Sequence, residues 1–145
     1  MLLSHRTSVN IRPEYSNIIG HMCYAASKLW NVCNYERRRY KELELEKYPD
    51  WYYQKKAHKG DLWYRQLPSQ TAQETCKQLD KAWKSFYVLK KTVGIKDPNP
   101  PRFKQDNIPI TYMQMGIQHE KGSDQLRLSL SKDLKKLYGR SLWDS

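Results

Sequence analysis

Residues 67–104 read LPSQTAQETCKQLDKAWKSFYVLKKTVGIKDPNPPRFK, and this stretch decides the fold. Five apolar residues recur in it at three- and four-residue spacing, which predicts the buried face of an amphipathic helix: Ala72, Cys76, Leu79, Trp83 and Phe86. Lysines at helical spacing line a neighbouring face of the same helix: Lys77, Lys81, Lys84 and Lys91. The helix is predicted to begin after Pro68, with Ser69 as its N-cap, and to end near Gly94.

A stiff loop is predicted to follow this helix, because three prolines between Lys96 and Pro101 force extended geometry. The loop ends in Arg102, Phe103 and Lys104. We interpret the two cations as phosphate contacts and expect Phe103 to anchor the loop in the core. The alternatives are a basic hinge for the loop and a solvated face for each lysine of the helix.

Before this stretch, the chain is predicted to form a strand and then a long helix. β-Branched residues alternate with polar ones from Met1 to Arg12, and Pro13 with Glu14 suits a first helical turn. The helix is expected to run toward Lys47, with this apolar stripe: Ile18, Met22, Ala25, Leu29, Val32, Cys33, Tyr40 and Leu43. Residues 37–39 are three arginines, which we expect mostly to be solvated and paired with nearby acids: Glu36, Glu42, Glu44 and Glu46. One or two of these arginines are candidates for contact with nucleic acid.

Between Pro49 and Gly60 the sequence predicts a short helix in which aromatic residues alternate with lysines. Such a pattern can stack bases and contact phosphates, and Tyr52 and Tyr53 are the candidates for this role. It can equally pack a helical bundle, which we favour for Trp51 and for Trp63. The two tyrosines cannot both point inward from a helix.

Beyond the loop the spacing of apolar residues changes to two. Residues 108–117 and 126–131 alternate around a turn at residues 121–124, which predicts a β-hairpin. Residues 131–139 form either a short helix or another turn. The order of elements therefore predicts an α+β chain, in which a helical bundle at residues 14–95 separates one early strand from later ones.

The composition favours an anionic partner for this chain of 145 residues. Its 26 basic and 15 acidic residues give a net charge of +11 and a pI near 9.6. Nucleic acid is the commonest such partner, and a merely basic soluble protein is the alternative. The three cysteines, at positions 23, 33 and 76, show no paired spacing, and no apolar run reaches membrane-spanning length. A reducing cytoplasm and no membrane contact are expected.

Three segments of the sequence resemble the N-terminal region of the TnpB (OrfB) transposon-encoded proteins, which are RNA-guided DNA endonucleases related to compact type V CRISPR effectors. The segments are LPSQ at residues 67–70, LDKAWKSF at residues 79–86 and PRFK at residues 101–104. Residues 110–112 and 126–128 resemble strands of the wedge domain of that family. The resemblance implies a small antiparallel β-barrel, incomplete here, that is split by a helical recognition lobe. It divides the chain into a first wedge strand at 1–13, the lobe at 14–95 and further wedge strands at 96–145.

The resemblance also implies a function, which is to bind guide RNA and target DNA for a prokaryotic or viral, nucleoid-associated enzyme. The lysine stripe would contact the backbone of the guide–target duplex, and Arg6 and Arg12 would lie near the duplex motif beside the target. No acidic triad of the RuvC type is found in the sequence, so we expect no cleavage by this chain and Mg²⁺ only with a nuclease domain, which a second chain could carry. The alternatives are a stand-alone DNA- or RNA-binding regulator and a basic protein-interaction module.

Overall fold

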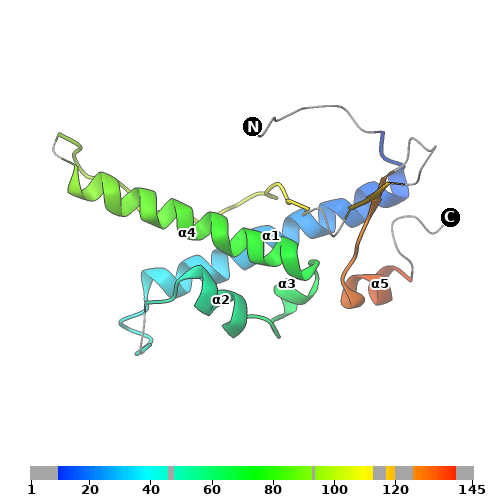
Figure 1. The fold of residues 1–145 in the computed structure, drawn as a ribbon, viewed down its shortest axis with the longest axis horizontal. Coiled ribbons are helices and arrows are strands. Elements are labelled where there is room, and N and C mark those ends of the chain that lie inside the picture. The colour runs from blue at the N-terminus through cyan, green and yellow to red at the C-terminus, as the bar shows by residue number, and fades with distance from the viewer. Residues whose placement is uncertain (1–9, 46–47, 93, 113–116, 120–125, 140–145) are drawn as a thin grey trace.

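The computed structural model describes residues 10–45, 48–92, 94–112, 117–119 and 126–139 (Figure 1). Its elements in chain order are α1 (Pro13–Arg38), α2 (Trp51–Ala57), α3 (Leu62–Arg65), α4 (Ser69–Lys91), β1 (Ile117–His119), β2 (Leu126–Leu128) and α5 (Lys132–Tyr138). The two long helices, α1 and α4, pack against each other and form the frame of the molecule. Helix α2 packs on α4, and α3 packs on α1, α4 and α5.

Helix α1 begins as the sequence predicts, with Pro13 in its first turn, but it ends at Arg38 rather than near Lys47. The chain then turns, and Glu44 adopts a left-handed backbone conformation with φ of 57°. This turn brings the ring of Tyr40 edge-on to that of Tyr48, at 5.1 Å between centroids. The apolar stripe is buried as far as the helix extends, except for Val32, which is 39% exposed. Tertiary packing of the two rings therefore replaces the last predicted turns of the helix.

Helix α4 carries the predicted apolar face. Four of its five residues are buried and Phe86 packs partly buried against them. The helix begins one residue earlier than predicted, because Pro68 is its N-cap and Ser69 is already helical, without a side-chain capping bond. It ends at Lys91, three residues before Gly94, which has a φ of 91°. The spacing of apolar residues thus predicts the buried face well and the ends less well.

Residues 101–112 form an extended segment that runs antiparallel along α1. Polar side chains of α1 donate hydrogen bonds to its backbone, from Trp30 Nε1 to the carbonyl of Arg102 at 3.1 Å and from Ser27 Oγ to that of Asp106 at 2.8 Å. Alternate residues pack partly buried against the core, as the period of two predicts: Ile108, Ile110 and Tyr112. Residues 101–112 are not a sheet strand, however, because their backbone bonds to a helix and not to a neighbouring strand.

The predicted hairpin is confirmed in β1 and β2, which pair antiparallel with Ile117 opposite Leu128. Its turn lies outside the described residues. Of the two predictions for residues 131–139, the helix is right: Ser131 caps α5 by accepting a hydrogen bond from the amide of Leu134, and Gly139 follows with a φ of 72°. Leu134 is fully buried in the same core as the residues of α1 and α4.

The fold class is therefore mixed, with mostly helical structure and a small antiparallel sheet. Among the described residues the sheet has two strands and is not closed, so the β-barrel stays a prediction. The predicted first strand lies largely in residues 1–9, outside the described part, and residues 10–12 are not in a strand. None of the helices in the described ranges combines the length and the apolar character needed to cross a membrane.

Candidate nucleic-acid interface

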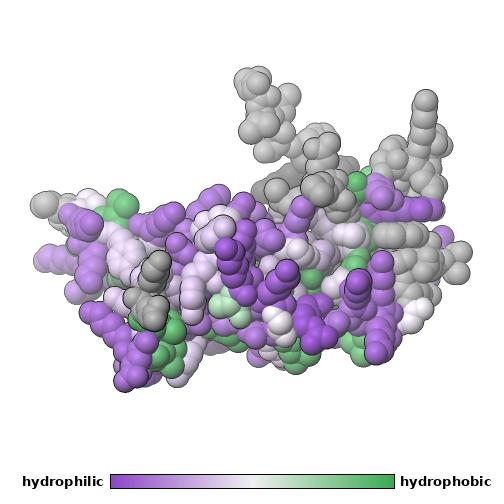
Figure 2. Space-filling view, turned by 60° about the horizontal axis from the view of Figure 1, so that its bottom comes forward, coloured by the Kyte–Doolittle hydropathy of each residue, from purple (hydrophilic) through white to green (hydrophobic). Residues whose placement is uncertain are grey.

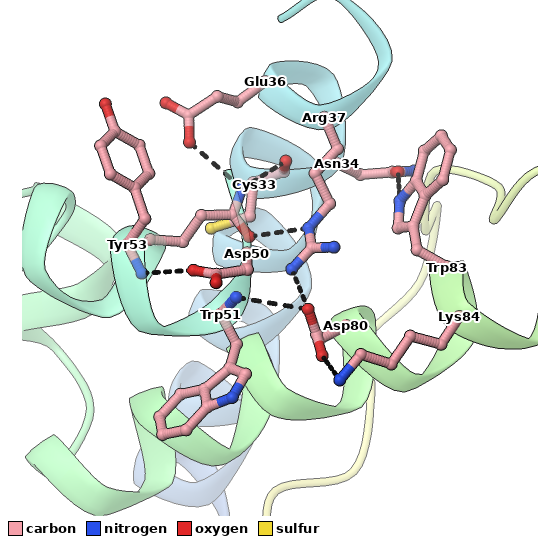
Figure 3. Close-up of polar contacts among 11 residues, drawn as sticks. Cys33, Asn34, Glu36, Arg37, Asp50, Trp51, Tyr53, Asp80, Trp83 and Lys84 are labelled. Carbon is pink, nitrogen blue, oxygen red and sulfur yellow. Dashed lines mark hydrogen bonds and ion pairs between the residues drawn. The ribbon is translucent and has the colours of Figure 1, made fainter. Parts of the chain in front are cut away.

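The basic surface is built over a buried polar network, which Figure 3 shows. Arg37 is 2% exposed, and its guanidinium donates to Gln54 Oε1 at 3.0 Å and to Asp80 Oδ1 at 2.8 Å. Lys84 pairs with the second oxygen of Asp80 at 2.9 Å. Burial alone would raise the pKa of Asp80, but the hydrogen bonds from Arg37 and Lys84 outweigh it and lower the pKa. This network fixes α1, α2 and α4 relative to one another.

The prediction that the arginine run is solvated is wrong for Arg37. The signal that could have revealed its burial is spacing, because Arg37 follows Cys33 by four residues and Asp80 follows Cys76 by four. Each charge therefore continues a buried helical face, and the two faces oppose each other. The prediction holds for Arg39, which is paired with Glu42 at 2.8 Å on the surface.

A second polar group ties the end of α2 to α1. The imidazole of His58 lies 3.2 Å from Glu36 and is also bonded to Asp61. The hydrogen bond to Glu36 is the largest cause that raises the pKa of His58 to about 9, against the lowering effect of burial. Gln54 accepts from Arg37 and donates to the carbonyl of Cys33, so both groups share one framework.

Next to this framework lies a group that we name the aromatic–lysine cluster: Trp51, Tyr52, Lys55, Lys56 and Lys77. The ammonium groups of Lys55 and Lys77 each lie 4.8 Å from the centre of the Trp51 ring. Those of Lys55 and Lys56 lie 4.6 and 4.2 Å from the centre of the Tyr52 ring. The hydrogen bond to Lys56 lowers the pKa of the half-exposed Tyr52 phenol. The fold thus brings together Tyr52 and Lys77, two site residues predicted from distant parts of the sequence.

The remaining predicted residues of α2 and α4 lie outside this cluster. Tyr53 is 38% exposed, and its amide donates to Asp50 at the start of α2. Lys81 and Lys91 are exposed, whereas Lys84, although exposed, is already paired with Asp80. As expected, Trp51 is partly buried against the core.

The predicted loop cations lie at a different place, along α1. Arg102 and Lys104 are both exposed, and the ammonium group of Lys104 lies 4.7 Å from the centre of the Trp30 ring. The expectation that Phe103 anchors the loop is wrong, because its side chain is 44% exposed. Backbone bonds hold the loop instead: Asn31 both donates to the carbonyl and accepts from the amide of Lys104, at 2.8 and 2.7 Å.

The loop also engages Arg38, which sequence reasoning did not single out. Its guanidinium lies 5.0 Å from the centre of the Phe103 ring and donates to the carbonyl of Pro101. Figure 1 shows the extended segment along one edge of the paired long helices and α2 on the other. Arg12 is exposed at the N-terminal end of α1, and Arg6 lies outside the described residues. The predicted cations therefore occupy separate places on the surface.

The face that carries α2 is covered mostly by hydrophilic residues, with smaller apolar patches between them (Figure 2). In the ranges that the structure describes, three or more His, Cys, Asp or Glu side chains nowhere gather in a way that could hold a metal ion. No protein-family model, curated protein or solved structure matches the chain. The resemblance to the TnpB proteins therefore stays a prediction.

Proposed function

We propose that this chain binds nucleic acid through the phosphate backbone, as the part of a TnpB-like RNA-guided DNA endonuclease that holds guide RNA and target DNA. The observation that carries the proposal is the aromatic–lysine cluster. Its three ammonium groups gather on two rings, and within the described ranges none of them has a carboxylate partner. Like charges that gather on neighbouring rings repel each other, and a strand of phosphates would relieve the repulsion.

The contacts within the cluster favour phosphate over base recognition. Lysines lie over the rings of Trp51 and Tyr52, so we assign these rings the role of positioning the ammonium groups rather than of stacking bases. Contact with the backbone suits a protein whose target sequence is read by base pairing with a guide. In this proposal Lys81, Lys91 and Arg12 add weaker contacts. The loop cations Arg102 and Lys104 meet a second stretch of backbone.

The resemblance supplies the finer parts of the proposal. The hairpin β1–β2 belongs to a wedge barrel, and the chain acts in the cytoplasm beside the nucleoid. It does not cut nucleic acid by itself, and Mg²⁺ enters with a nuclease domain.

The first test is to purify the chain, sequence the RNA that co-purifies and repeat binding across a salt series. We expect one enriched structured RNA, and an affinity that falls steeply with salt. Each lost phosphate contact changes the slope of log affinity against log salt by roughly 0.7–0.9. The Lys55→Ala/Lys77→Ala variant should therefore reduce the slope by roughly 1–2. The control Lys132→Ala/Lys136→Ala, which removes the same charge from exposed positions of α5, should change it by less.

Two other results would decide against the proposal. Sequence-specific binding of duplex DNA without RNA would support the regulator alternative. Binding to protein that does not weaken with salt would support the interaction-module alternative. The apolar side chains available to such a module include Val88 and Leu89, which are 64% and 44% exposed near the end of α4.

A further inference from the structure

A pocket of about 340 Å³ is lined by residues 37–42, at and beyond the end of α1, and by residues of the C-terminal half of α4. Figure 1 shows that the two helices diverge toward these ends. Four aromatic side chains line it: Tyr40, Trp83, Phe86 and Tyr87. The rings of Trp83, Phe86 and Tyr87 contact one another, with centroids 5.5 to 5.8 Å apart. Trp83 is buried, whereas Tyr87 is 37% exposed and can meet a ligand.

Tyr48 contacts two of the aromatic residues that line the pocket. The ring of Tyr48 lies edge-on to Tyr40 at 5.1 Å and steeply inclined to Tyr87 at 6.1 Å, so it connects the turn after α1 with α4. The guanidinium of the buried Arg37 lies 5.5 Å from the centre of the same ring. The aromatic residues of the pocket are therefore linked through Tyr48 to the buried Arg37. A ligand would meet a preformed surface.

The lining of the pocket is also basic. Five cations and one carboxylate line it, and the carboxylate, Glu42, is already paired with Arg39. Arg37 is neutralised by the buried Asp80. Two lining lysines, Lys41 and Lys90, have no carboxylate partner among the described residues. The charge that remains favours an anionic ligand.

The size and chemistry of the pocket together indicate one class of ligand. Its volume is at the lower end of the roughly 300–1,000 Å³ typical of ligand pockets, which is far too small for a duplex. An aromatic wall beside unpaired lysines suits a planar base joined to a phosphate. We infer that the pocket takes one unstacked nucleotide of a single-stranded nucleic acid. Its base lies against Tyr87, and its phosphate is held by Lys41 and Lys90.

This inference rests on the proposed function and assigns a different task to a different place. In the aromatic–lysine cluster the rings carry lysines, which suits backbone contact alone. In the pocket, the ammonium group of Lys90 lies 5.9 Å from the centre of the Phe86 ring, and no lysine of the described ranges lies over Tyr87. Arg38 lines the pocket and also bonds to the carbonyl of Pro101, so the pocket borders the basic loop. A strand that leaves the pocket would therefore meet further cations.

The test uses the full chain and a single-stranded RNA oligonucleotide that contains one 2-aminopurine, with the matching DNA oligonucleotide and the RNA duplex as comparisons. Stacking on Tyr87 should quench the 2-aminopurine fluorescence when the single strand binds. Lys41→Ala/Lys90→Ala should weaken single-strand binding about fivefold or more, while duplex binding changes about twofold at most. The control Lys132→Ala/Lys136→Ala, with the same loss of charge, should affect the two ligands equally. Comparison of the RNA and DNA strands shows which backbone the pocket prefers.

The aromatic contact is tested separately. Tyr87→Ala should abolish the quenching, and Tyr87→Phe, which keeps the ring, should retain it. If Tyr87→Phe retains the quenching, its loss in Tyr87→Ala is attributed to the missing ring rather than to loss of the fold. Quenching that persists in Tyr87→Ala, or equal effects of the two lysine pairs, would overturn the inference and leave the proposed function standing. If the unmodified chain binds neither single strand nor duplex, both the inference and the proposed function are wrong.

Discussion

The buried pair of Arg37 and Asp80 provides the sharpest test of the physical account. The substitution Asp80→Asn keeps the shape of the side chain and removes its charge. The guanidinium of Arg37, 2% exposed, would then lose its ionic partner at 2.8 Å and keep only neutral acceptors, among them Gln54. Water cannot take the place of the lost charge at so buried a site. Breaking a buried pair in this way leaves a charge uncompensated, which typically costs about 3–5 kcal/mol.

Lys84 provides a matched control, because it contacts the same carboxylate from the solvent side. Its side chain is 74% exposed, and its ammonium group lies 2.9 Å from the second oxygen of Asp80. Water replaces such a contact readily, so Lys84→Ala should cost at most about 1 kcal/mol. Two partners at nearly the same distance from one carboxylate are therefore expected to differ severalfold in their contribution to stability.

The assay is urea denaturation followed by tryptophan fluorescence, together with thermal melting. Asp80→Asn should lower the melting temperature by roughly 6–20 °C and Lys84→Ala by a few degrees at most. The double substitution Arg37→Met/Asp80→Leu should recover most of the loss, because apolar groups of similar volume can replace a buried pair. A cost below about 1 kcal/mol for Asp80→Asn, or equal costs for the two single variants, would refute the reasoning.

The same pair has a consequence for stability in acid. The net effect of its contacts is to lower the pKa of Asp80 below its ordinary value of 3.8. A carboxylate whose pKa is lower in the folded state contributes stability above its unfolded pKa, and this contribution is lost as the pH falls through the folded value. The Asp80→Asn variant should therefore lose less of its remaining stability in acid than the unmodified chain does.

Three further predictions concern the contacts that order the rest of the molecule. The pKa of His58, raised to about 9 by its bond to Glu36, should appear in an NMR titration and fall in Glu36→Gln. Because the folded value exceeds the unfolded 6.5, the stabilising contribution of His58 should be complete below pH 6.5 and be lost as the pH rises through 9. Asn31→Ala should speed hydrogen exchange at the amide of Lys104, which donates to the Asn31 side chain at 2.7 Å. Tyr112→Phe should cost about 1 kcal/mol in urea denaturation, because its hydroxyl donates to a backbone carbonyl at 2.6 Å.

Each of these predictions has a control or a contradicting result. A titration of His58 near 6.5 would show that its acidic partners do not stabilise the charged form. Asn107→Ala removes a longer hydrogen bond from the same segment, 3.3 Å to the carbonyl of Gly20, and should leave exchange at Lys104 unchanged. Tyr24→Phe removes a hydroxyl from a side chain that is 45% exposed and should change stability little. If it costs as much as Tyr112→Phe, the buried hydrogen bond is not the cause.

The elements of the fold that follow from local spacing were predictable. The buried face of α4 needs only a period of 3.6, and the hairpin needs only a period of two on each side of a turn. The end of α1 was not predictable in this way, since the packing of Tyr40 on Tyr48 decides it. Residues 108–112 show the same limit, because alternation gives the buried side of a segment and not the partner of its backbone.

The candidate site was predictable as a set of residue types and not as an arrangement. Tyr52 and Lys77 were each selected for their own pattern, and only the packing of α2 on α4 brings Lys77 over the Trp51 ring, next to Tyr52. Phe103 was wrongly predicted to anchor the loop in the core, because a large apolar residue in a short loop suggests a buried side chain. The polar side chains of α1, such as Asn31, hold the backbone of that loop instead.

The arginine run shows why a count of basic residues overstates the charge that a partner can use. Successive residues of a helix point about 100° apart, so three consecutive arginines face three different environments. Arg37 points inward and is neutralised by Asp80, Arg39 is paired with Glu42 beside it, and Arg38 bonds to the loop and keeps its charge. Part of the positive charge that stays unpaired therefore resides in lysines that lie over aromatic rings. This distribution is why the substitutions proposed for testing nucleic-acid binding remove lysines and leave the arginines in place.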